Sequence, residues 1–130
     1  MLAPTVSHAQ TRVPPQVVAC HYTYGGQTKL LEARPQASPY AVPRIQVGSY
    51  FLLRAVWQTE PASSASVSIY TYADASDGPV IIHQASYPLP LPKNGPFGFT
   101  GLQRVYEPMR DGELIYWCEL RTTDAGKTKP

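Results

Sequence analysis

The sequence predicts an all-β protein, namely an antiparallel two-sheet sandwich of immunoglobulin-like architecture with about seven strands. The 14 Pro, 9 Gly and 9 Tyr among 130 residues disfavour helices, because proline breaks helix interiors and aromatic side chains suit a pleated sheet. Short segments of alternating apolar and polar residues also recur along the chain, with turn residues between them, which is typical of a sandwich. A small closed β-barrel is the alternative.

The length and composition fit one folded domain. A chain of 130 residues is the size of a single domain, and 43% apolar residues exclude a disordered chain. We expect the sandwich to span residues 16–122, after a signal-peptide remnant and disordered segment over 1–15 and before a flexible tail over 123–130. No apolar run is long enough to span a membrane.

The expected strands are separated by recognisable turns. Gly25-Gly26 predicts a hairpin turn, and the polar residues of 74–78 predict another. The segments with strand patterns are 16–24, 28–33, 47–58, 66–73, 80–87, 99–107 and 113–121. In the strongest of them, four large or apolar residues alternate on one face: Phe51, Leu53, Ala55 and Trp57.

Two proline-rich segments interrupt this pattern. Residues 34–45 carry Pro35, Pro39 and Pro43, and we expect an irregular or polyproline-like crossover because proline cannot donate to a strand ladder. Residues 88–96 contain four prolines and an Asn-Gly pair. This segment is expected to be an exposed loop with a polyproline stretch.

The two cysteines predict a disulfide between the first and last strands. Cys20 and Cys118 each share the parity of the apolar residues in their own strand, so the bond would lie inside the core. It would close a loop of about a hundred residues and contribute about 4–5 kcal/mol in the chain-entropy description. Two buried free thiols are the alternative. Because antibody domains carry their cysteines in inner strands, we predict the architecture and not the family.

The N-terminus predicts export to the periplasm or the exterior. Ser7-His8-Ala9 places small residues three and one positions before Gln10, as a signal peptidase requires. We therefore expect the numbered start to lie inside a longer signal peptide, with Gln10 as the mature terminus; a disordered tail is the alternative. The residues ending at Cys20 resemble a lipobox, but a polar, proline-broken stretch precedes them, which disfavours lipidation.

The sequence carries no arrangement typical of catalysis, metal binding or nucleic-acid binding. The net charge is +2 and the basic residues are scattered, which disfavours a nucleic-acid partner. The carboxylates Glu107, Glu113 and Glu119 are expected to point outward rather than to form a catalytic pair. His21 and His83 lie in expected strands without a nucleophile motif. We expect no enzyme activity, cofactor or metal.

A binding role is the remaining expectation. Tyr70 and Tyr72 share the less apolar face of their strand, so we expect their rings to meet solvent and to bind a protein or carbohydrate, together with Tyr87, Pro90 and Pro92. Ordinary cross-strand packing of tyrosines is the alternative. A secreted inhibitor of a hydrolase such as a lysozyme or protease, presenting the 88–96 loop, is a second hypothesis. A small hydrolase that uses His21 or His83, with both histidines in one pocket, is a third.

Overall fold

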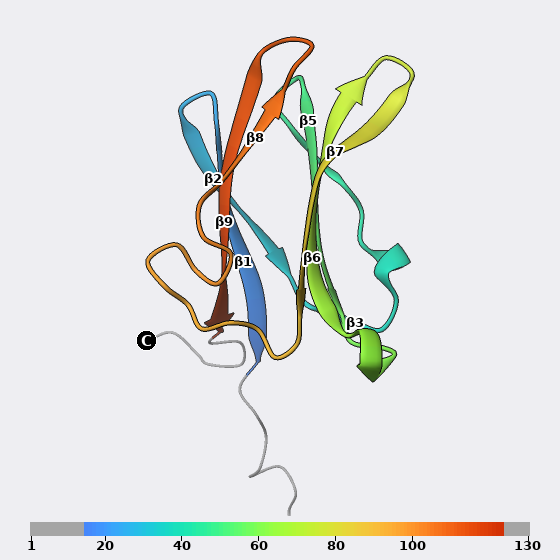
Figure 1. Ribbon diagram of the computed structural model, residues 1–130, viewed down its shortest axis with the longest axis vertical. Coiled ribbons are helices and arrows are strands. Elements are labelled where there is room, and N and C mark those ends of the chain that lie inside the picture. The colour runs from blue at the N-terminus through green and yellow to red at the C-terminus, as the bar shows by residue number, and fades with distance from the viewer. Residues whose placement is uncertain (1–14, 124–130) are drawn as a thin grey trace, which may run out of the picture.

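The computed structural model describes residues 15–123, which form two packed β-sheets (Figure 1). The four-stranded sheet has the order β2-β1-β9-β8, and the five-stranded sheet has the order β3-β5-β6-β7, with β4 also paired to β5. The predicted all-β sandwich is confirmed. The alternative of a closed barrel is wrong, because each sheet keeps its own edges. The signal-peptide and tail predictions fall outside the described residues, apart from Pro15 and Thr123.

Turns connect most of the strands, and two longer segments, 37–44 and 89–102, connect the others. In the four-stranded sheet they are β1 (Gln16–Tyr24), β2 (Gln27–Ala33), β8 (Gln103–Glu107) and β9 (Gly112–Thr122). In the five-stranded sheet they are β3 (Pro35–Gln36), β4 (Ile45–Val47), β5 (Phe51–Gln58), β6 (Ser66–Ala75) and β7 (Gly78–Pro88). Two 3₁₀ turns, η2 (Pro39–Ala41) and η3 (Ala62–Ser64), complete the fold. None of the helical turns within residues 15–123 has the length and hydropathy of a membrane span.

The core lies between the two sheets and follows the alternation of the sequence. The four residues predicted to share one face of β5 are all buried there. Their antiparallel neighbours on β6 are buried too, and Arg54 points to the opposite, outer face. Other large core side chains come from both sheets and, in the case of Phe99, from the segment between β7 and β8: Val18, Tyr22, Val67, Ile69, Phe99, Val105, Leu114 and Tyr116.

The disulfide joins Cys20 of β1 to Cys118 of β9, as predicted. The two cysteines lie directly opposite each other in the antiparallel ladder, and both are fully buried in the core. The first and last strands are therefore neighbours in one sheet, and the bond does not connect the two sheets. This position differs from that of the inter-sheet bond of antibody domains.

The proline-rich segment 34–45 contains β3 and ends at the first residue of β4, so part of the expected irregular or polyproline-like crossover is strand instead. β3 pairs in parallel with one end of β5, at Trp57 and Gln58, and β4 pairs antiparallel with the other end. The count is nine strands rather than about seven, and one pairing is parallel. Pro35 is tolerated because β3 lies at the sheet edge, where a missing N–H group breaks few ladder bonds.

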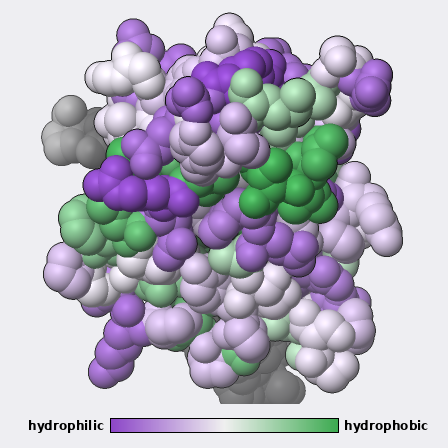
Figure 2. Space-filling model, turned by 45° about the horizontal axis from the view of Figure 1, so that its top comes forward, coloured by the Kyte–Doolittle hydropathy of each residue, from purple (hydrophilic) through white to green (hydrophobic). Residues whose placement is uncertain are grey.

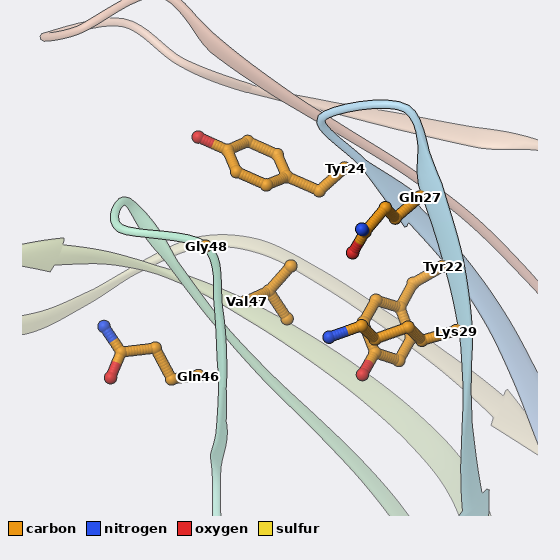
Figure 3. A pocket seen from close by; sticks show the side chains of 7 residues that line it. All are labelled: Tyr22, Tyr24, Gln27, Lys29, Gln46, Val47 and Gly48. Atoms are coloured by element: carbon orange, nitrogen blue, oxygen red, sulfur yellow. The ribbon is translucent and has the colours of Figure 1, made fainter.

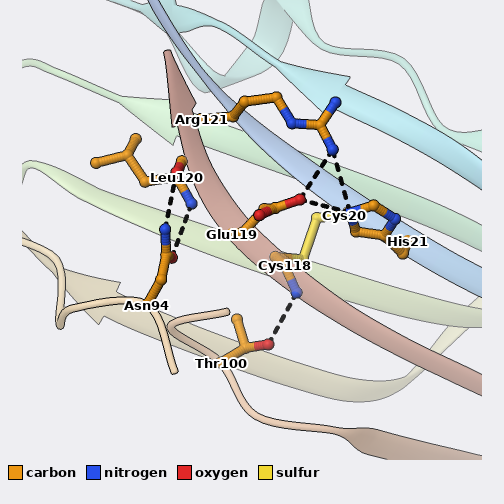
Figure 4. Close-up of polar contacts among 8 residues, drawn as sticks. All are labelled: Cys20, His21, Asn94, Thr100, Cys118, Glu119, Leu120 and Arg121. Carbon is orange, nitrogen blue, oxygen red and sulfur yellow. Dashed lines mark hydrogen bonds and ion pairs between the residues drawn. A yellow bond between two sulfur atoms is a disulfide. The ribbon is translucent and has the colours of Figure 1, made fainter. Parts of the chain in front are cut away.

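The expected strand over 99–107 begins only at Gln103, because the segment before it pairs with β9 through two side chains and a single backbone bond, from the Phe99 N–H group to the Cys118 carbonyl at 2.9 Å. The side chain of Asn94 donates to the carbonyl of Leu120 at 2.9 Å and accepts from its N–H group at 3.1 Å. Thr100 Oγ1 accepts from the Cys118 N–H group at 2.9 Å (Figure 4). These bonds satisfy the part of the β9 edge that β8 does not reach, and they fix the end of the 88–96 loop.

Candidate binding surface

The outer face of the five-stranded sheet carries the tyrosine pair that the sequence analysis singled out. Tyr70 and Tyr72 project from this face of β6, with their ring centroids 6.4 Å apart in a stacked arrangement. The expectation that both rings meet solvent is wrong for Tyr72, which is only 6% exposed, while Tyr70 is half-buried. Covering residues come from a distant part of the chain, which the strand pattern of β6 could not reveal.

Those covering residues belong to the segment between β3 and β4, residues 37–44, which we call the arch. Among residues 15–123, no strand pairs with the β5 edge between Leu53 and Trp57, and the arch spans this gap on the outer side of the sheet (Figure 1). Arg54 holds the arch in place: its Nε donates to the carbonyl of Val42 at 2.8 Å, and its Nη2 donates to the carbonyl of Pro39. Its guanidinium carbon also lies 5.4 Å from the centroid of Tyr70.

A groove of about 640 Å³ runs between the arch and the sheet. Arg44 of the arch places its guanidinium carbon 5.2 Å from the centroid of Tyr72. Tyr40, also of the arch, is 91% exposed. Val42, Leu52 and Pro79 supply apolar walls. The volume is in the range of small-ligand sites, and the lining combines apolar area with a few polar groups, as binding sites do.

The charge of this groove is not neutralised within the described part of the protein. Neither Arg44 nor Arg54 has a carboxylate within ion-pair distance among residues 15–123. The groove lining itself contains no acidic residue. Sequence analysis missed both arginines and Tyr40. The available signal for Arg54 was an arginine inside the otherwise apolar run 51–57.

The other predicted binding residues lie elsewhere. Tyr87 is half-buried on the inner face of β7, where its ring packs edge-to-face against Phe99 at a centroid distance of 5.3 Å. Burial raises the pKa of the Tyr87 phenol. Pro90 and Pro92 are exposed on the 88–96 loop, beyond the end of β7 (Figure 1). The structure therefore does not bring these three residues into the groove that Tyr72 lines.

The two histidines lie on different sheets and different faces. His21 is on the outer face of the four-stranded sheet, where its ring stacks on Trp117 at a centroid distance of 4.0 Å. His83 faces the interior, and its Nε2 is hydrogen-bonded to the Tyr116 hydroxyl at 2.7 Å. Burial lowers the pKa of His83 and raises that of Tyr116. A hydrolase that needs both histidines in one pocket does not fit this arrangement.

A polar cluster surrounds His21 on the outer face. Glu119 Oε2 lies 2.7 Å from His21 Nε2 and 2.9 Å from Nη2 of Arg121 (Figure 4). Burial alone would raise the pKa of Glu119, but the hydrogen bonds from His21 and Arg121 outweigh it and hold the pKa below its ordinary value. Glu119 is thus held by two neighbours in its own sheet, His21 on β1 and Arg121 on β9 itself.

The expectation that Glu107 points outward is wrong. Its side chain is fully buried, and its carboxylate accepts from the Arg110 N–H group at 2.8 Å and pairs with the Arg110 guanidinium at 3.3 Å. The guanidinium in turn lies over the ring of Tyr50, with its carbon 4.2 Å from the centroid. A buried carboxylate needs such a partner, and here the partner comes from the β8–β9 turn.

A smaller pocket lies where the β1–β2 hairpin faces β4 (Figure 3). It encloses about 150 Å³, and Tyr22, Tyr24 and Lys29 line one side while Gln46 and Gly48 line the other. This volume is below the range of typical ligand sites. Within residues 15–123, no group of three or more His, Cys, Asp or Glu side chains could hold a metal ion.

The β6–β7 hairpin carries exposed apolar residues at one end of the sandwich. Val80 and Ile81 of the edge strand β7 are 53% and 51% exposed, and Figure 2 shows a hydrophobic patch at this end of the molecule among polar surroundings. Ile81 is the cross-strand neighbour of Tyr72. The apolar area of this hairpin therefore adjoins the groove.

Comparison with known proteins finds no relative for this chain: no protein-family model matches it, and no curated protein or solved structure is significantly similar to it.

Proposed function

We propose that this protein is a non-catalytic binding module that acts outside the cytoplasm, in the periplasm or after secretion, and holds a protein or carbohydrate partner on the outer face of its five-stranded sheet. The groove between the arch and β5–β6 supports this proposal most directly. It combines an almost fully exposed tyrosine with an arginine that has no acidic partner among the described residues. Tyrosine and arginine, with tryptophan, are enriched among the residues that dominate binding energy at interfaces.

The disulfide supports the proposed compartment. Disulfides persist in oxidising environments and are rare in the cytosol, and the bond between Cys20 and Cys118 is compatible with such an environment. Fractionation of the native host tests this part of the proposal. We expect the protein in the periplasmic or extracellular fraction, and its recovery with the cytosol would contradict the assignment.

Affinity capture tests the binding role. The tagged protein is used to capture partners from the native envelope, and bound proteins and glycans are identified by mass spectrometry. Tyr40→Ala removes a ring that is 91% exposed, so folding should be unaffected while capture weakens. Tyr106→Ala is the matched control, because this exposed tyrosine lies on β8 of the other sheet. Equal capture by both variants would count against the groove, and no specific capture by the unaltered protein would refute the binding role.

Inhibition of a hydrolase is the second candidate, and the anchoring of the 88–96 loop favours it. Asn94 fixes the end of this loop to β9, while Pro90 and Pro92 stay exposed. A pre-organised loop loses little entropy on entering an active site. Dose-dependent inhibition of a lysozyme or protease, lost on Asn94→Ala, would support this function, and no inhibition across such enzymes would argue against it.

A further inference from the structure

The ligand chemistry of the groove follows from which hydrogen-bonding groups remain unused. The Arg54 guanidinium already donates to two arch carbonyls, so its geometry is committed to holding the arch. Arg44 is an exposed residue, and among residues 15–123 its guanidinium contacts the face of Tyr72 but has no hydrogen bond or ion pair. Because Arg44 and Arg54 both line the groove, their positive potentials add there. A planar guanidinium with free N–H groups is matched best by a carboxylate or a phosphate.

The remainder of the lining distinguishes a peptide from a sugar. Apart from the arginines and the tyrosine hydroxyls, the lining side chains are apolar: Val42, Pro43, Leu52 and Pro79. The hydroxyl groups of a sugar ring require both donors and acceptors, which amide and carboxylate side chains usually supply. This groove has neither kind of side chain. Apolar walls beside a cation suit a peptide that places an acidic residue between apolar ones.

From these observations we infer that the partner of the groove is an acidic segment of a protein chain, whose carboxylate pairs with Arg44 while its apolar side chains pack on Tyr40 and on the walls near Leu52 and Pro79. This inference rests on the proposed binding function and narrows the choice of partner that the function leaves open. Attraction between the two arginines and the carboxylate would also speed encounter, and it would weaken as salt concentration rises.

Titrations with defined ligands test the inference. ¹⁵N-labelled protein is titrated with a blocked hexapeptide that contains two glutamates beside leucine and tyrosine, with the same peptide carrying glutamines, and with trigalacturonate as an acidic sugar. We expect the glutamate peptide to shift amide signals of the arch and of Leu52, with a dissociation constant of about 1 mM. The glutamine peptide should bind about tenfold more weakly, because it lacks the charge-assisted hydrogen bond.

Arg44→Gln is the decisive variant, and Arg104→Gln is its matched control. Arg104 is an exposed arginine on the other sheet, with Glu113 at 3.7 Å. Arg44→Gln should weaken the glutamate peptide about tenfold, and Arg104→Gln should leave it unchanged. Equal binding of the two peptides, no effect of Arg44→Gln, tighter binding of trigalacturonate, or no binding of any ligand would each overturn the inference.

The same variants separate failure of this inference from failure of the proposed function. If capture from the envelope depends on Tyr40 but not on Arg44, the groove binds a partner that is not recognised by its acidity. The proposed function then stands and the inference falls. If the unaltered protein captures nothing specifically, both fall.

Discussion

Removal of the disulfide is the sharpest test of how this fold is stabilised. Cys20 and Cys118 are separated by 98 residues, so the bond closes most of the folded chain into one loop. In the chain-entropy relation, a loop of this length destabilises the unfolded state by about 4.7 kcal/mol at 25 °C. The double variant Cys20→Ala/Cys118→Ala should therefore lose about 4–5 kcal/mol of unfolding free energy. Proteins of this size have total stabilities of roughly 5–15 kcal/mol, so the variant should be marginally stable.

The structure predicts that the loss comes mainly from the unfolded state. β1 and β9 pair in register from Gln16–Thr122 to Thr23–Ile115, and this ladder does not depend on the sulfur atoms. Urea unfolding of the oxidised protein and of the double variant measures both effects. The unfolding free energy should fall, and the dependence on urea should steepen because the open chain exposes more surface.

Two results would refute this reasoning. A loss below about 2 kcal/mol would mean that closing the long loop contributes far less than the entropy relation predicts. An Ellman titration of the denatured, unreduced native protein that finds two free thiols would show that the bond does not form in the cell. The second result would also remove the support that the disulfide gives to an extracytoplasmic location.

Three further predictions concern single residues. Gly98→Ala should destabilise the fold by at least about 2 kcal/mol more than Gly25→Ala. Both glycines have positive φ, but only at Gly98 would a Cβ atom lie 2.0 Å from a backbone carbonyl oxygen of β9. Equal losses of unfolding free energy in urea would contradict this. Arg110→Ala should lower the unfolding free energy by about 2–3 kcal/mol in the same assay, because it leaves the buried Glu107 without its cation. The loss is moderate because solvent already screens Arg110, which is one-third exposed. A neutral effect would refute the stabilising role of the pair. Burial lowers the pKa of His83 below its ordinary 6.5, so the unfolded state takes up more protons and the unfolding free energy should decline as pH falls below about 6.5. His83→Gln should flatten that decline, and an unchanged pH profile of stability would show that His83 does not cause it.

The sequence predicted those parts of the fold that depend on local pattern. Alternation identified the buried face of β5, because side chains at every second position of a strand point to the same face of the sheet. The Gly25-Gly26 pair identified the first hairpin, since both glycines adopt the positive φ values that the turn requires. The parity of Cys20 and Cys118 identified a bond inside the core.

Features that depend on distant parts of the chain could not be predicted in this way. β3 has two residues and β4 three, which is too short for any alternation to be visible. Glu107 has the same parity as the buried Val105, but its charge suggested the opposite orientation. The pairing with Arg110 that permits its burial depends on the conformation of a turn. Tyr72 is covered by residues some thirty positions earlier in the sequence.

The structure of the arch explains why Arg54 affects both the fold and any binding at the groove, whereas Arg44 can be tested for binding alone. β3 runs parallel to β5 and β4 runs antiparallel to it, so the chain between them must reverse direction, and it does so away from the sheet. The reversal leaves carbonyl groups without strand partners, and Arg54 satisfies those of Pro39 and Val42. Substitution of Arg54 would therefore release the arch, and a loss of binding could not be assigned to contact with the ligand. Arg44 anchors nothing in the described fold beyond the face of Tyr72. Arg44→Gln changes the charge of the groove without removing an anchor of the arch, and this is why the recognition of a partner is best examined at that residue.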